Sequence, residues 1–251
     1  SIVATNTTVN VAEGSDSMKG RNGAENGTVT INGSTDGVAV NVAYIKSESD
    51  YYYAYTSIEA AIEAAKAGET IVLIRDITAS DIITINKAIT LDGNGKKLTS
   101  TAGRAINVNG ADGVTIKNLT INASGERAIN IIQNATNVTI DNVTATAANY
   151  TVNVAATAAN AVVAIKGSNL TGLNVVNVAA PQANVTINGG TITCNDQTEK
   201  EGYAALALNK DAVGAKIAAT SDVTFDIKGD SKKASNGAVD GVITIGGSTE
   251  E

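Results

Sequence analysis

The sequence predicts an all-β fold, a right-handed parallel β-helix preceded by a capping helix and a short β-rich segment. Three observations support this prediction. The chain of 251 residues is 43% hydrophobic but has one Phe and no Trp, so aliphatic residues must build its core. Short apolar motifs recur every 22–25 residues from residue 69 onward. A single stretch near residue 60 has the periodicity of an amphipathic helix.

The β-rich N-terminal segment is predicted over residues 1–55. Short pieces such as Val9-Asn10-Val11 and Thr28-Val29-Thr30-Ile31 alternate apolar and polar positions, as strands do. Four of the seven tyrosines gather at its end, at Tyr51, Tyr52, Tyr53 and Tyr55. We expect a strand that packs on the cap and buries alternate tyrosines. The alternative is an exposed aromatic patch in which Tyr51 and Tyr53 bind a glycan or a protein.

Residues 56–251 form the second predicted region, which begins with the capping helix at 56–68. Thr56 is the expected N-cap, and Glu59 completes a capping box three residues later. Gly68 is expected to close the helix. One apolar face is formed by Ile58, Ala61, Ile62 and Ala65.

The repeats from residue 69 onward contain three motifs. The first is apolar–Asn–apolar, with asparagines 23, 23 and 24 residues apart at Asn107, Asn130, Asn153 and Asn177. The second is seen in Val114-Thr115-Ile116, Val138-Thr139-Ile140, Val163-Ala164-Ile165 and Val185-Thr186-Ile187. The third starts at Asn118, Asn142 and Asn169, which we place at a bend with left-handed backbone angles. Three short strands per repeat predict about seven or eight coils, each about 4.8 Å above the last.

Two parts of the chain resemble a known family. Thr56-Ser57-Ile58-Glu59-Ala60-Ala61 and Ala67-Gly68-Glu69-Thr70-Ile71-Val72-Leu73 resemble the entry helix and first strand of pectate-lyase-like β-helix proteins. Lys87-Ala88-Ile89-Thr90-Leu91-Asp92-Gly93-Asn94-Gly95 and the segment from Val114 to Ile121 are similar to the following coils. The resemblance covers about residues 55–190. It implies a module of the kind common in exported surface proteins of Gram-positive bacteria, and hence an extracellular location at the bacterial cell surface.

Composition narrows the classes of function. The net charge is −7 and no long basic run is present, which argues against nucleic acid and against an anionic membrane as partners. No stretch is long and apolar enough for membrane insertion as a helix. The chain has no histidine, so His-dependent triads and His metal sites are excluded. The single cysteine, Cys194, is in phase with Ile192 and is expected to be buried.

Two arginines stand in register and form the main candidate ligand site. Arg104 and Arg127 are 23 residues apart, and Tyr150 holds the next equivalent position. They could form a cationic strip for a uronate or a sulfate. The alternative is two exposed arginines stabilised by neighbouring acids such as Glu126. A second column, Lys117, Asp141 and Lys166, alternates in sign and is interpreted as a surface salt-bridge ladder.

Enzymes of the resembled superfamily cut acidic polysaccharides, and the lyases among them need Ca²⁺-holding carboxylates and an Arg or Lys base. The alternative function is therefore a polysaccharide lyase that uses Arg104 or Arg127. The hydrolase pattern is absent, because the chain lacks histidine, Arg-x-Lys and an Asp-Asp pair.

No cofactor is expected, and Ca²⁺ is the one ion for which the sequence offers candidate ligands. These are Asp196, Glu199 and Glu201, in an insertion whose alternative interpretation is a solvated loop. Asp92-Gly93-Asn94-Gly95 is interpreted as a corner turn. A threonine-covered β-helix would suggest ice binding, which needs two threonines per strand, but Thr115, Thr139 and Thr186 supply one each.

The resulting expectation is a non-catalytic β-helix module that acts as an adhesive, ligand-binding or stalk domain. Its expected partners are a glycan or a protein on a host or other cell surface.

Overall fold

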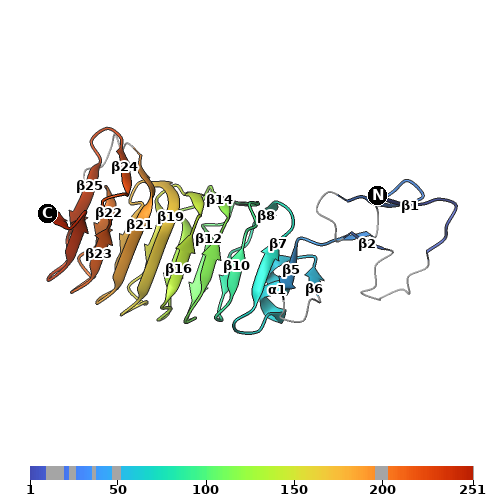
Figure 1. The fold of residues 1–251 in the computed structure, drawn as a ribbon, viewed down its shortest axis with the longest axis horizontal. Helices are drawn as coiled ribbons and strands as arrows, with labels where there is room; N and C mark the ends of the chain where they lie inside the picture. Colours follow the sequence, from blue (N-terminus) through green and yellow to red (C-terminus); the bar gives the residue numbers. More distant parts are fainter. Residues whose placement is uncertain (10–19, 23–26, 36–37, 47–51, 196–202, 251) are drawn as a thin grey trace.

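The chain is an elongated parallel β-helix, as the sequence predicts (Figure 1). The computed structural model describes residues 1–9, 20–22, 27–35, 38–46, 52–195 and 203–250. The stack has about nine turns, slightly more than predicted from the repeat length. The N-terminus lies at one end of the long axis and the C-terminus at the other (Figure 1).

Each coil contributes strands to three stacked sheets, which we call the first, second and third sheet. The first contains β7 (Thr70–Leu73), β10 (Thr90–Asp92), β13 (Thr115–Lys117), β16 (Val138–Asp141), the first parts of β19 (Val162–Gly172) and β21 (Asn184–Cys194), β23 (Lys216–Ala219) and β26 (Val242–Ile245). The second contains β8 (Ile77–Ala79), β11 (Lys97–Ser100), β14 (Thr120–Ala123), β17 (Thr144–Thr146), the second parts of β19 and β21, and β24 (Thr224–Ile227). The third contains β9 (Ile83–Ile85), β12 (Arg104–Asn109), β15 (Arg127–Ile132), β18 (Tyr150–Val154), β20 (Val176–Val178), β22 (Ala204–Leu208) and β25 (Lys232–Asn236).

The two ends of the stack carry antiparallel strands. At the N-terminal end, β5 (Ala43–Lys46) pairs with both β6 (Tyr52–Tyr55) and β7. At the C-terminal end, β27 (Ser248–Glu250) pairs with β26. Two further parallel pairs precede the stack: β1 (Ile2–Ala4) with β3 (Val29–Ile31), and β2 (Gly20–Asn22) with β4 (Val38–Val40). The first 55 residues therefore include two strands, β5 and β6, that belong to the sheet of the stack.

The helix α1 (Ile58–Ala64) covers the N-terminal end of the core with the apolar face predicted for it. Its N-cap is Ser57 and not Thr56, because the Ser57 hydroxyl accepts the bond from the Ala60 N–H at 3.1 Å. The helix also ends before Gly68, which has a φ of +87° and forms the turn into β7 instead. Lys87 of the first coil donates to the carbonyl groups of Glu63 and Ala65, which fastens the helix end to the stack.

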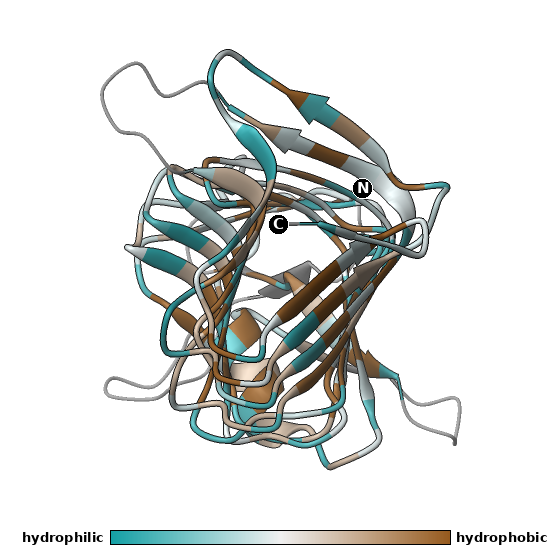
Figure 2. Ribbon diagram, turned by 90° about the vertical axis from the view of Figure 1, so that its left-hand side faces the viewer, coloured by the Kyte–Doolittle hydropathy of each residue, from teal (hydrophilic) through white to brown (hydrophobic). Residues whose placement is uncertain are grey.

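The core consists of aliphatic side chains that lie one above another in successive coils. Apolar and polar residues alternate along the strands (Figure 2), so each strand turns one side to the core and one away from it. One column contains Ile106, Ile129, Val152, Val176 and Leu206, all buried. Cys194 lies in this core, as predicted, and its Sγ donates to the Leu173 carbonyl at 2.9 Å.

The corner between the first and second sheets has left-handed residues, as predicted for two of three asparagines. Asn118 and Asn142 have φ values of 51° and 52°. The prediction is wrong for Asn169, which lies inside β19 and pairs with Thr144. Gly167, with a φ of 51°, takes the left-handed position in that coil because glycine tolerates it without strain.

Candidate functional site

The arginine row, which we define as Arg104, Arg127 and Tyr150, has the register that the sequence predicts. The three residues begin β12, β15 and β18 of the third sheet and are direct neighbours across the strands. The guanidinium groups of Arg104 and Arg127 thus project from points about 4.8 Å apart. The fold therefore holds two like charges together at one edge of the sheet.

Arg127 is partly neutralised by its surroundings. Its Nη2 atom lies 3.2 Å from Oε1 of Glu126, and the exposed fractions of these two side chains are 18% and 46%. The guanidinium carbon also lies 5.3 Å from the centre of the Tyr150 ring, a cation–π contact. Exposed ion pairs contribute little, so the ring and the partial burial, rather than Glu126, define the position of Arg127.

Both arginines retain hydrogen-bonding capacity that the described part of the protein leaves unused. The Nε atoms of Arg104 and Arg127 are buried and have no partner among the described residues. Oδ1 of Asn149, next to Tyr150 in the chain, is buried without a partner as well. Guanidinium groups bind carboxylates and sulfates through N–H donors, and because both Nε atoms are buried, the terminal Nη groups are the donors that the row can offer to an anionic group.

A ladder of asparagines crosses the same strands, and we call it the strand ladder. Its members are Asn107, Asn130, Asn153 and Asn177. The Nδ2 atoms of Asn130, Asn153 and Asn177 each donate to the Oδ1 of the asparagine in the previous coil, at 2.9, 2.7 and 2.7 Å. These side chains alternate with core-facing residues, yet Asn130, Asn153 and Asn177 are only 2%, 3% and 6% exposed. The strand ladder is therefore a buried, internally bonded part of the fold.

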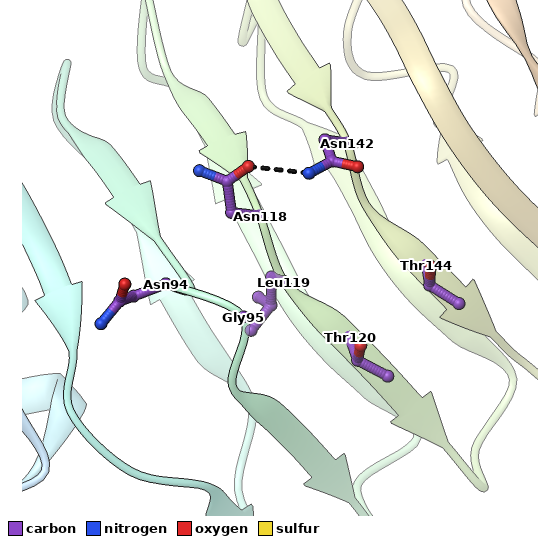
Figure 3. Close-up of a pocket in the computed structure, with 7 residues that line it drawn as sticks. All are labelled: Asn94, Gly95, Asn118, Leu119, Thr120, Asn142 and Thr144. Carbon is purple, nitrogen blue, oxygen red and sulfur yellow. Dashed lines mark hydrogen bonds between the residues drawn. The ribbon is translucent and has the colours of Figure 1, made fainter. Parts of the chain in front are cut away.

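A second ladder lies at the corner between the first and second sheets, and we call it the corner ladder. Asn142 donates to Asn118 at 2.9 Å (Figure 3), and Asn118 donates to Asp92 at 3.2 Å. Asp92 also accepts from the Asn94 N–H and pairs with Lys117 at 3.3 Å. The segment from Asp92 to Gly95 is thus a corner turn, as predicted.

A cleft of about 360 Å³ runs along this corner over three coils. Figure 3 shows Asn118 and Asn142 bonded to each other at the corner, and Thr120 and Thr144 side by side on adjacent strands. Its lining is Asn94, Gly95, Asn118, Leu119, Thr120, Asn142 and Thr144. The lining has no charged side chain, so the cleft offers amide and hydroxyl groups only.

The lysine–aspartate column has the predicted register, since Lys117, Asp141 and Lys166 are direct neighbours. Asp92 of the preceding coil extends it and provides the only ion pair of Lys117 among the described residues. Signs thus alternate along this column, whereas they repeat along the arginine row.

Several predicted site residues lie outside the described residues. These are Tyr51 and all three members of the candidate Ca²⁺ loop, Asp196, Glu199 and Glu201. The backbone of Tyr53 is in β6, opposite Ile45. Tyr55, at the end of that strand, is half-buried against the core.

Two kinds of feature are absent from the described residues. No helix in them is long and apolar enough to cross a membrane. No group of three or more Cys, Asp or Glu side chains among them lies close enough together to hold a metal ion.

Comparison of the chain with family models, with curated proteins and with solved structures found no match.

Sequence reasoning found the arginine row but missed two features. The cleft at the corner depends on which coils lie side by side, and the spacing alone did not assign its residues to one groove. The second feature is a pair of threonines on one strand, for which the sequence around the third motif does hold a signal. Thr144-Ala145-Thr146 and Thr191-Ile192-Thr193 each place two threonines on the same side of one strand.

Proposed function

We propose that the chain is a non-catalytic ligand-binding module of an exported bacterial surface protein, and that its ligand is an acidic glycan held by the arginine row. The observation that carries this proposal is the register of Arg104 and Arg127, which places two guanidinium groups side by side at one edge of the third sheet. Two adjacent like charges do not help the fold, so a bound anion accounts for them best. The resemblance of the entry helix and first coils to pectate-lyase-like proteins supports the extracellular location.

The charge pattern favours a uronate or sulfated sugar over a neutral one. A carboxylate or sulfate placed between the guanidinium groups accepts N–H bonds from both arginines. The ring of Tyr150 lies next in the row, and the part of it that does not contact Arg127 offers an apolar surface for a sugar ring. The proposed ligand therefore runs along the stack, across the starts of β12, β15 and β18.

The test is the affinity of the full chain for oligogalacturonate and for chondroitin sulfate, with maltohexaose as the neutral comparison. We expect the double variant Arg104→Ala/Arg127→Ala to lose at least about tenfold in affinity, equal to about 1.4 kcal/mol. Lys117→Ala/Lys166→Ala removes the same charge from the first sheet and is the matched control. Equal losses in both double variants would show non-specific attraction and would contradict the proposal.

The same samples test the alternative function, a polysaccharide lyase. Oligogalacturonate is incubated with the wild type with and without Ca²⁺, and new unsaturated ends are followed by ultraviolet absorbance. Turnover that is lost in Arg104→Ala or Arg127→Ala would replace the non-catalytic proposal with the lyase. No turnover together with binding supports the module proposed.

A further inference from the structure

The outward side of the second sheet carries two parallel ranks of small uncharged side chains, which we call the threonine face. The first rank is Thr120, Thr144, Asn169 and Thr191. The second rank is Asn122, Thr146, Thr171 and Thr193. Six of these eight positions are threonine. The ranks are in register over four consecutive coils, in strands β14, β17, β19 and β21.

The side chains of the threonine face are accessible and make no side-chain hydrogen bonds to the described part of the protein. All eight are exposed or half-buried. None of them has a side-chain hydrogen-bond partner among the described residues, in contrast to both asparagine ladders. Charges appear only in the flanking strands, at Lys97 of β11 and Asp226 of β24. Among the described residues, the eight positions of the threonine face therefore present methyl, hydroxyl and amide groups alone.

The core fixes the ranks in place. Between the two ranks, each strand points one residue inward, and Ile121, Ala145, Leu170 and Ile192 are all fully buried. Threonine is β-branched and has a restricted side-chain torsion in strands, so its hydroxyl groups are held with little freedom. A rigid array loses little entropy when a regular surface binds to it.

The spacing of the array follows from strand geometry. Neighbouring members of one rank are about 4.8 Å apart, and the two ranks are about 6.7 Å apart, which is two residues of an extended strand. The first distance is close to the shorter repeat between oxygen atoms in hexagonal ice, and the second is somewhat shorter than its axial repeat. A two-dimensional array of hydroxyl groups with these repeats can order water in the ice lattice, while the methyl groups exclude disordered water.

We propose that the threonine face binds ice. A sugar chain is a poorer match, because no aromatic ring lies within the two ranks and stacking on rings supplies much of sugar affinity. The cleft of Figure 3 borders the first rank at Thr120 and Thr144, so the uncharged surface continues around the corner. This site shares no residue with the arginine row.

Asn122 and Asn169 interrupt the array, and they make the proposal sharply testable. Each stands where threonine would continue its rank, and both are exposed positions in strands. Replacement by threonine adds a methyl and a hydroxyl group in register and also suits a strand better. We therefore expect Asn122→Thr/Asn169→Thr to raise ice activity above that of the wild type.

The experiment measures inhibition of ice recrystallisation by the full chain as a function of protein concentration. We expect the wild type to inhibit growth and Thr146→Tyr to need at least about tenfold more protein, because the ring holds the lattice off the face. Thr139→Tyr, on the single threonine column of the first sheet, is the matched control and stays at the wild-type value. Circular dichroism checks that each variant is folded.

Three results would overturn the proposal. One is crystal growth in the presence of wild type equal to that with a non-binding protein. Another is equal activity of Thr146→Tyr and the wild type, and the third is no gain in Asn122→Thr/Asn169→Thr. The double variant Arg104→Ala/Arg127→Ala keeps full ice activity if the two sites are independent, so failure of one proposal leaves the other in place.

Discussion

The second and third sheets are built from the same coils, yet their stacked polar side chains have opposite relations to the rest of the protein. In the third sheet, the strand ladder bonds to itself and is buried. In the second sheet, the threonine face is accessible, and its side chains bond to no described residue. In a β-helix, polar residues at equivalent positions of successive coils form a column along the axis. A column whose side chains bond to one another has a structural role, whereas a column without internal hydrogen bonds is available for binding. The arginine row is intermediate, because Arg127 contacts Glu126 and Tyr150 while other donors of the row have no partner among the described residues.

The largest effect is expected from a break in the strand ladder. Asn153→Ala removes two bonds at once and leaves Oδ1 of Asn130 and Nδ2 of Asn177 buried without partners. We expect a loss of about 2–4 kcal/mol in the free energy of unfolding, from urea denaturation. Asn122→Ala, which removes an exposed asparagine of the second sheet, is the control and should change the stability by less than about 0.5 kcal/mol. Equal losses of unfolding free energy in both variants would contradict the proposed difference between the second and third sheets.

A substitution in the corner ladder should lower the free energy of unfolding by less than one in the strand ladder, and for a different reason. Asn142→Ala places an L-residue without a polar side chain at a φ of 52°, which costs about 1–2 kcal/mol. Asn142→Gly loses the same side-chain bond to Asn118 but relieves the backbone, so its stability should exceed that of the alanine variant. Urea midpoints of the two variants measured side by side check this order. A glycine variant that is less stable than the alanine variant would show that the positive φ at this position does not destabilise alanine, and it would contradict this prediction.

Removal of threonine hydroxyl groups should leave the stability almost unchanged. Thr144→Val keeps the shape and the β-branch of the side chain while it removes an unpartnered hydroxyl, and we expect a change within about 0.5 kcal/mol. Differential scanning calorimetry can measure it. A clear destabilisation would show that the hydroxyl has a structural role. The threonine face would then not differ from the strand ladder in the way proposed.

The smallest effect concerns Cys194 and alkaline pH. Burial raises the pKa of the Cys194 thiol, and a hydrogen bond with Ser231 partly offsets this. Because the pKa is higher in the folded state, the stabilisation is complete below the pKa of the unfolded thiol, near pH 8.5, and is lost as the pH rises above it. Cys194→Ala should have a shallower fall of thermal midpoint between about pH 8.5 and 10. Identical slopes in both proteins would contradict this.

The repeat motifs predicted the fold because each coil buries apolar residues at the same positions, so Ile106, Ile129 and Val152 had to lie one above another. The register of Arg104, Arg127 and Tyr150 followed from the same spacing. Asn169 was placed wrongly because the motif Asn-Leu-Thr repeats the sequence of a corner, while Gly167 two residues earlier takes the left-handed angles. The N-cap differs by one residue from the prediction because Thr56 and Ser57 are both capping residue types and Glu59 at the capping-box spacing favoured Thr56.

Other features could not be predicted from the motifs. Which side chains are buried on the outward side of the third sheet depends on the shape of the neighbouring columns, and the sequence does not encode it locally. The pairing of β5 with β7 is antiparallel and lies outside the repeated coils, so the repeat pattern does not predict it. The threonine face was within reach of the sequence, since Thr144 and Thr146 share a side of one strand.

One measurement tests most directly whether structural and binding columns are separate. Urea unfolding is followed for the wild type, for Asn153→Ala and for Arg104→Ala/Arg127→Ala, each with and without oligogalacturonate. A ligand that binds the folded state raises the unfolding midpoint. We expect Asn153→Ala to lower the midpoint but keep the shift caused by the ligand, and the arginine variant to keep the midpoint but lose the shift. If either variant lost both, or if the arginine variant kept the shift, the division between the strand ladder and the arginine row would be wrong.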